Sequence, residues 1–356
     1  MVILGHCIQH LLSTDYVDET GYVMIYSFHM PLFMMLSGYF ASSGLKRNFL
    51  SGIVTKAQQL LLPCISASVI MALLYYVAKG CNFSYRLNFE LLYAFWFLKT
   101  AFFCFLLART AYSFGKFKII AFLTTLFLTQ IPQINHIPYF TTNIDIMYPC
   151  FVVGILLKTY WDRIKANSKS IAIVTGIIFV VMLLFWGKEF WQPTYAMLYK
   201  LKAGEYTEGF YLTYIRLYKL AIGISGSIFF ITLFHLCISA THNAIVKKAC
   251  TYGEYTMGIY ILQTFVLETI LAQYINFDNV NSWVFNLLIA PLLSILILAL
   301  CTYLSKILDR YKYTAFLFLG KKIEGHHTFY TQGYNFINKL LPLLYKNIIS
   351  LQYCRN

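Results

Sequence analysis

Charged side chains are scarce in this sequence. Asp, Glu, Lys and Arg make up 12% of its 356 residues, whereas a soluble domain usually has about 25%. Hydrophobic residues make up 59%, and the mean hydropathy is +0.63. This composition excludes an ordinary soluble globular domain and predicts an integral membrane protein.

The sequence also has few acidic residues and no closely spaced pairs of cysteines. The nine cysteines are scattered, mostly within apolar runs, and no two of them form a CxxC pair. Such spacing supports neither a disulfide framework nor a metal site, so we expect free thiols and no bound metal. The sequence has 14 acidic residues and 28 Lys and Arg. Attraction to anionic lipid headgroups explains this excess of basic residues, so no nucleic-acid partner is implied.

Apolar runs long enough to cross a bilayer recur along the chain. They predict an all-α, polytopic transmembrane bundle of about ten spans within residues 1–306. Residues 307–356 are expected to form a cytoplasmic tail, in which Phe336–Leu351 is an amphipathic helix on the membrane surface. The expected spans are 1–14, 23–42, 54–78, 90–112, 117–132, 142–160, 171–187, 210–239, 254–275 and 282–306.

Basic residues are unevenly distributed between alternate loops. One set of loops carries clusters such as Lys46, Arg47 and Lys56, whereas the other set carries Asp15 and Asp18. The positive-inside rule therefore places both termini in the cytoplasm. We expect a multi-pass protein of the inner (plasma) membrane.

Two histidines, His6 and His29, lie inside the first two apolar runs. An ionisable group within lipid is costly, so each is a candidate functional group. At about 1.5 Å per helical residue, His6, His29, Lys99 and Glu268 lie at a similar depth, roughly 12–15 Å from the outer boundary. We hypothesise that they line one polar cavity. Structural explanations stay open, because a histidine can simply bond a neighbouring helix and Lys99 can extend to the interface.

Four short motifs follow one another along the first hundred residues. They are Leu4-Gly5-His6, Phe28–Phe33 with Leu36–Phe40, Lys56 with Leu60–Pro63, and Trp96-Phe97-Leu98. In this order they resemble the acyltransferase-3 family of integral membrane acyltransferases. More narrowly, the sequence resembles the bacterial O-acetyltransferases that act on cell-surface sugars. The resemblance covers residues 1–306.

The resemblance implies transfer of an acyl group, most often acetyl from acetyl-CoA, to a hydroxyl of a cell-surface or lipid-linked saccharide. His6 is the expected general base, because imidazole titrates near neutrality; a nucleophilic role is the alternative. His29 is expected to orient the donor or to stabilise the oxyanion. Glu268 is our own addition, a carboxylate that would hold one imidazole in the required tautomer.

Acyl-CoA is expected as a donor substrate, with no tightly bound cofactor. Lys46, Arg47 and Lys56 are candidates for its phosphates, because ammonium and guanidinium groups bind phosphate; topogenic charge is the alternative. Trp96 and Lys99 are candidates for substrate binding. The remaining partners would be the saccharide acceptor and membrane lipid.

The sequence departs from the family pattern at two places. Family members usually carry an arginine or lysine about ten residues before the first-helix histidine, but only five residues precede His6. We therefore expect a truncated sequence or a mis-assigned start. Gln263 stands where a histidine is common, so no essential base is expected there.

Two other functions have to be weighed. A transporter or flippase of a lipid-linked sugar would also have many spans, buried ionisable groups and a basic inner face. The sequence has no repeated halves of the kind that is typical of transporters. The other alternative is an acyltransferase-like protein that has lost catalysis.

Overall fold

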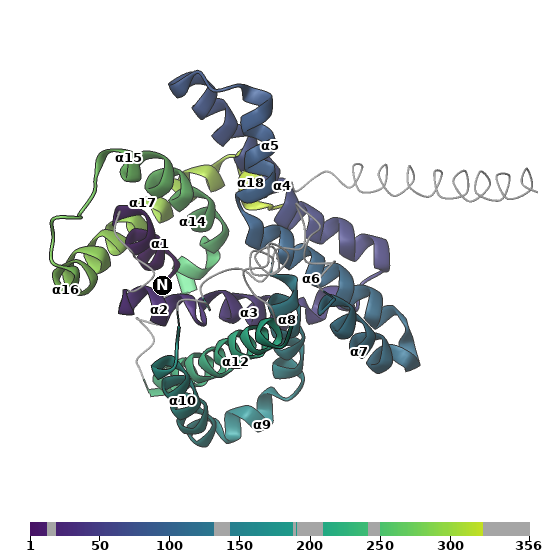
Figure 1. The fold of residues 1–356 in the computed structure, drawn as a ribbon. Coiled ribbons are helices and arrows are strands. Elements are labelled where there is room, and N and C mark those ends of the chain that lie inside the picture. Colours follow the sequence, from purple (N-terminus) through teal and green to yellow (C-terminus); the bar gives the residue numbers. More distant parts are fainter. Residues whose placement is uncertain (13–18, 132–142, 188–189, 191–208, 241–249, 323–356) are drawn as a thin grey trace, which may run out of the picture. The chain divides into compact units, whose positions relative to one another are not determined.

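The protein is helical throughout the residues that its structure, a computed structural model, describes (Figure 1). These residues are 1–12, 19–131, 143–187, 190, 209–240 and 250–322. The all-α class is therefore confirmed for this part of the chain. The elements are α1 (Val2–Leu11), α2 (Thr20–Tyr26), α3 (His29–Leu45), α4 (Phe49–Lys79), α5 (Phe83–Tyr93), α6 (Trp96–Ser113), the 3₁₀ turn η2 (Gly115–Phe117), α7 (Lys118–Thr129), α8 (Ile144–Thr159), α9 (Trp161–Ala166), α10 (Ser168–Leu184), α12 (Gly209–Ala240), α14 (Thr256–Gln263), the π-helix η5 (Thr264–Leu271), α15 (Ala272–Tyr274), α16 (Ser282–Val284), the π-helix η6 (Phe285–Ile289), α17 (Ala290–Arg310) and α18 (Lys312–Leu319).

Four helical stretches in the described residues are long and apolar enough to cross a membrane: Thr20–Leu45, Phe49–Lys79, Thr213–Ile238 and Ser282–Arg310. The pair α5 and α6 would form a fifth span, bent by 53°. Each of the ten expected segments contains a helix. Because the other helices are shorter, the count of ten spans and the side on which the termini lie stay predictions.

The stretch Thr20–Leu45 is broken between α2 and α3, and Pro31 explains the break. Proline has no backbone N–H, so Pro31 cannot donate to the carbonyl of Ser27 four residues earlier, and its ring crowds that carbonyl. Phe28 leaves helical geometry there, with φ −135° and ψ −18°. Pro31 therefore lies in the first turn of a new helix, where proline is tolerated.

A second irregularity bends the chain between α5 and α6. Phe95 takes a left-handed conformation with φ +51°, which is rare for a bulky residue. The strain is offset by burial, because the Phe95 side chain packs in a small core with Leu98, Cys64 and Ile261. The bend therefore anchors the start of α6 against α4 and α14.

The largest core joins α3, α6 and α8. Gly38 in α3 and Gly154 in α8 allow these two helices to touch, because a Cβ atom at Gly38 would lie 2.0 Å from the carbonyl oxygen of Phe151. A Cβ atom at Gly154 would lie equally close to the carbonyl oxygen of Met35. Small residues that let backbones approach are the usual basis of helix pairing in membranes, where the hydrophobic effect contributes little between helices.

A second core holds the short helix α1. Ile3, Cys7, Ile8 and Leu11 are buried against side chains of α14, η5 and α17. Figure 1 shows α1 beside α17. This packing fixes which face of α1 turns toward η5.

The first compact unit of the chain runs from Met1 to Gly320. The domain boundary that we expected at residue 306 falls inside α17, and α18 packs on α4 with Gly320 against Gln59. Residues 307–320 belong to this compact unit by their contacts, and the division of the chain into a membrane domain and a tail stays a prediction. The expected amphipathic helix Phe336–Leu351 lies outside the described residues.

Replacing Gly38 by valine should disrupt the contact between α3 and α8. The new side chain would meet backbone atoms that cannot move aside alone, so the free energy of unfolding should fall by about 3 kcal/mol. Thermal unfolding of the detergent-solubilised protein measures the loss. Gly253→Ala is the matched control, because nothing lies within 4 Å of a Cβ atom there. Equal stability of the two variants would contradict this account.

Candidate active site

His6 and Glu268 form the central pair of the candidate site. Nδ1 of His6 lies 3.1 Å from Oε1 of Glu268, which joins α1 to η5 across 262 residues of sequence. A carboxylate only accepts hydrogen bonds, so the Nδ1–H of His6 is the donor. The neutral ring then keeps its lone pair on Nε2. The His6 and Glu268 side chains are 23% and 31% exposed, so neither is sealed within the protein.

His10 lies one turn beyond His6 on the same face of α1. Its ring stacks near that of His6, with the centroids 5.6 Å apart, and its Nε2 lies 3.8 Å from Oε1 of Glu268. This distance is too long for a hydrogen bond. His10 was not among the residues predicted from the sequence, although its spacing of four residues from His6 places both rings on one face of a helix.

Glu268 lies in the π-helix η5, and its position depends on that irregularity. A π-helix is wider than an α-helix, is rare, and frequently occurs at functional sites. After η5 begins at Thr264, the side chains that follow point in directions that differ from those of a regular α-helix. Gln263, immediately before η5, is buried, and its amide has no hydrogen-bond partner among the described residues.

His29 is held differently from His6. Its side chain is buried, and its Nδ1 lies 2.9 Å from the carbonyl oxygen of Ile25, which also accepts a long hydrogen bond of 3.4 Å from the backbone N–H of Phe28. The ring also packs edge-on against Tyr26, with the centroids 4.6 Å apart. Tyr26 donates a hydrogen bond to Gln9 of α1 and closely approaches Gly5. Tyr26 therefore connects His29 to the helix that carries His6.

Lys99 and Trp96 lie at the bend between α5 and α6. The Lys99 ammonium is buried and donates hydrogen bonds to the carbonyl oxygens of Leu91 and Leu92, at 2.7 and 2.8 Å. These carbonyls belong to the last turn of α5, where a lysine offsets both the unpaired acceptors and the helix dipole. Trp96 packs against the core of α3, α6 and α8. Substrate binding by Lys99 and Trp96 stays a prediction.

Four basic residues lie near the junction between the end of α3 and the start of α4. Lys46 and Arg47 are exposed, and Lys56 lies with its ammonium 5.9 Å from the centroid of the Phe105 ring. Arg109 of α6, which the sequence analysis missed, is buried and donates a hydrogen bond to the carbonyl oxygen of Arg47 at 2.7 Å. None of the four forms an ion pair with a carboxylate of the described residues. This basic cluster therefore has cationic groups available for an anion.

An ion pair between α8 and α12 was not predicted from the sequence. Nε of Arg216 lies 3.3 Å from Oδ2 of Asp145, and Nη1 of Arg216 donates to the carbonyl oxygen of Gln130. The Gln130 amide in turn donates to the backbone carbonyl of Asp145. Charged residues inside two expected spans were the signal that could have located this pair.

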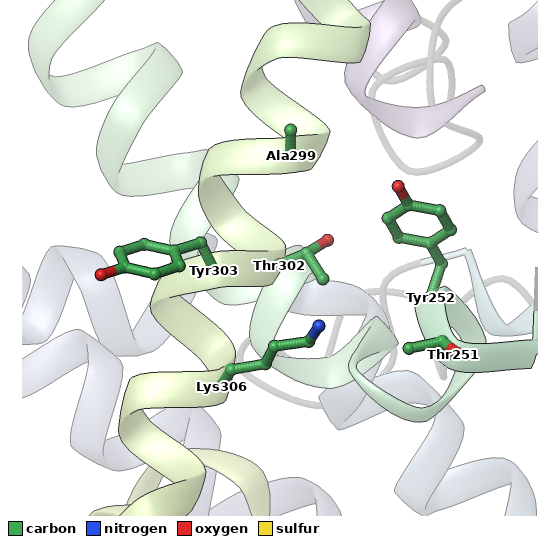
Figure 2. A pocket seen from close by; sticks show the side chains of 6 residues that line it. All are labelled: Thr251, Tyr252, Ala299, Thr302, Tyr303 and Lys306. Atoms are coloured by element: carbon green, nitrogen blue, oxygen red, sulfur yellow. The ribbon is translucent and has the colours of Figure 1, made fainter. Parts of the chain in front are cut away.

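A cavity of about 260 Å³ lies away from these groups. Figure 2 shows it between α17 and a helical turn at 250–254, with the Lys306 side chain directed toward Thr251 and Tyr252. Thr302, Ala299 and Tyr303 complete its lining. None of the predicted site residues lines this cavity, so the candidate site is the partly exposed cluster around His6.

The chain belongs to the acyltransferase-3 family, whose acyltransferase domain matches residues 1–306. It is similar to nodulation protein NolL of Mesorhizobium japonicum, with 29% identity over 202 residues that cover 53% of this chain and 54% of that protein. It is also similar to nodulation protein NolL of Sinorhizobium fredii, with 27% identity over 212 residues, 53% of this chain and 55% of that protein. The chain thus spans about half the length of the curated relatives it matches. No solved structure matches the chain.

The role of Lys99 can be tested by replacing it with methionine. This change keeps the length of the side chain but removes the donor to two carbonyls, so the free energy of unfolding should fall by about 1.5–3 kcal/mol. Thermal unfolding in detergent measures it, with the exposed Lys116→Met as control. Unchanged stability together with a raised KM for the acceptor would instead favour the substrate role.

Proposed function

We propose that this protein is a membrane-embedded O-acyltransferase that moves an acyl group, acetyl in the first instance, from acyl-CoA to a saccharide hydroxyl. Family membership supports the reaction class. The observation that carries the proposal is the His6–Glu268 pair, because it is a base held by a carboxylate on a partly exposed surface. The saccharide acceptor, at the cell surface or linked to lipid, follows from the resemblance to sugar O-acetyltransferases.

In the proposed reaction, the Nε2 lone pair of His6 accepts the proton of the acceptor hydroxyl as its oxygen attacks the thioester carbonyl. The tetrahedral intermediate then collapses, the carbon–sulfur bond breaks, and the imidazolium returns the proton to the leaving thiolate. Glu268 holds the proton on Nδ1 and stabilises the imidazolium while it exists. The same arrangement would support direct attack of Nε2 on the thioester, which is the alternative role of His6.

His29 would orient the donor. Its Nδ1–H is already used by the carbonyl of Ile25, so a neutral ring has no second N–H with which to stabilise an oxyanion. That role would require the protonated ring. Buried beside Tyr26, His29 is better suited to fix the wall of the site on which the acyl group rests.

The basic cluster is proposed as the anchor for the phosphates of coenzyme A. Lys46, Arg47 and Lys56, together with Arg109, lie at the opposite end of α3 from His29. The helix has 17 residues, so the two ends are roughly 25 Å apart at ~1.5 Å per residue. Coenzyme A suits this separation, because a long pantetheine arm joins its phosphates to its thiol.

The membrane arrangement belongs to the same proposal. About ten spans with both termini in the cytoplasm would place the basic cluster on the inner side of the inner membrane. The donor would then enter from the cytoplasm, and the acceptor would approach the histidines from the outer side. Residues 188–209, which we expect to border the acceptor, lie outside the described residues except for Phe190 and Gly209.

Substitutions in the central pair test the catalytic proposal. His6→Ala removes the base and should lower kcat by at least about 100-fold, because general acid–base catalysis typically contributes 10²–10⁴-fold. Glu268→Gln should lower kcat without a comparable change in either KM. Acetylation of the acceptor by membranes containing each variant measures the rates.

The control for the histidine change is His235→Ala, whose ring packs on Trp161 of α9. Expression and membrane content should be equal for all three variants and the parent. Full activity of His6→Ala would remove His6 from the mechanism. Equal losses of activity and of folded protein in Glu268→Gln would assign that carboxylate a structural role.

Lys56→Ala tests the donor site. Loss of one ammonium should raise the KM for acyl-CoA about tenfold and leave kcat nearly unchanged, because the phosphates lie far from the reacting atoms. Steady-state kinetics at a saturating acceptor concentration measures both constants. Lys79→Ala at the other end of α4 is the matched control and should change neither. An unaltered KM in Lys56→Ala would refute the phosphate role.

A further inference from the structure

His6, His10 and Glu268 form a group with the composition of a transition-metal site. Each residue offers one ligand atom, and these atoms all lie within 4.8 Å of one another. His10 Nε2 and His6 Nδ1 lie 3.8 and 3.1 Å from the same carboxylate oxygen of Glu268. The two histidines come from successive turns of α1, and the carboxylate comes from η5.

These distances are close to those that a zinc ion requires. Zinc binds histidine nitrogen and carboxylate oxygen at about 2.0–2.2 Å with tetrahedral angles, which places neighbouring ligand atoms about 3.3 Å apart. The His6–Glu268 separation of 3.1 Å already meets that value. The His10–Glu268 separation of 3.8 Å exceeds it by about 0.5 Å, and the two histidine nitrogens, within 4.8 Å of each other, would have to approach as well. All three side chains are partly exposed, so they are not sealed within the protein and the rings have room to adjust.

The ligand set also selects the kind of ion. Two imidazoles and one carboxylate suit zinc and its neighbours in the first transition series, whereas magnesium and calcium prefer oxygen ligands only. Three protein ligands would leave a fourth position for water. We propose that His6, His10 and Glu268 bind one zinc ion, and that this ion reversibly inhibits the protein.

Inhibition follows from the position of one proton and rests on the proposed function of His6. Coordination through Nδ1 needs the lone pair of that nitrogen, so the proton on Nδ1 has to leave it. A neutral imidazole carries a single proton, which then resides on Nε2. The lone pair that would accept the proton of the acceptor hydroxyl is lost. Glu268 is at the same time drawn to the metal.

Zinc binding is measured on the full-length protein, purified without a polyhistidine tag, stripped of metal with a chelator and exchanged into chelator-free buffer. Equilibrium dialysis against zinc chloride should show one saturable ion for each chain. His10→Ala should weaken this binding at least about tenfold, whereas His235→Ala should not change it. His10→Gln repeats the test if the alanine variant is poorly folded. Because other cysteines and histidines can bind zinc, the difference between His10 and His235 variants identifies the site.

Acyl transfer gives the second readout. Zinc should inhibit the parent protein, a chelator should restore its rate, and His10→Ala should need at least about tenfold more zinc for the same inhibition. The inhibition of each protein is expressed relative to its own chelator-treated rate, because the His10 ring stacks near that of His6 and its removal can change the basal rate. Magnesium chloride should have no effect on either protein.

The dialysis result tests the metal site independently of the proposed acyltransferase function. One zinc ion bound through His10 in a protein without acyltransferase activity would retain the metal site and refute the proposed function. Binding that does not saturate near one ion, or that is the same in the parent and both His10 variants, would overturn the metal site whatever the enzyme activity. Saturable binding without inhibition would overturn the inhibitory role.

Discussion

An ionisable side chain placed among apolar helices has to find a partner, and the His6–Glu268 contact is the place where this protein meets that requirement. The contact ties together two elements that are 262 residues apart. One of them, α1, is a ten-residue helix that is held by packing against α14, η5 and α17. The proposed chemistry and the proposed metal site both depend on this juxtaposition.

Three irregularities of the backbone position the polar groups around this contact. At the break around Phe28 the carbonyl of Ile25 keeps a long backbone hydrogen bond, from Phe28, and the His29 ring donates a second one to it. The bend at Phe95 brings the Lys99 ammonium to the last carbonyls of α5. The π-helix η5 carries Glu268. Polar backbone groups at irregular positions within a membrane need hydrogen-bond partners. His29 and Lys99 therefore bind backbone carbonyls and have structural roles.

The sequence located the helices and the family from local features. Apolar runs fix where helices form, because the backbone in lipid has to satisfy its own hydrogen bonds. The motifs around His6 and His29 depend on neighbouring residues and were recognisable without a fold; they agree with the match to the acyltransferase domain over residues 1–306. Depth could also be estimated, because the rise along a helix is constant.

The sequence alone thus determined a helical, apolar protein of the acyltransferase-3 family with ionisable groups inside its helices. Only the tertiary structure decided which of those groups meet. It paired His6 with Glu268 and placed His10 beside them. It also showed that Lys99 binds carbonyls at the end of α5, and that Asp145 pairs with Arg216. The reason is geometric: sequence gives the position of a residue along a helix axis, whereas its direction around that axis depends on breaks, π-helices and packing.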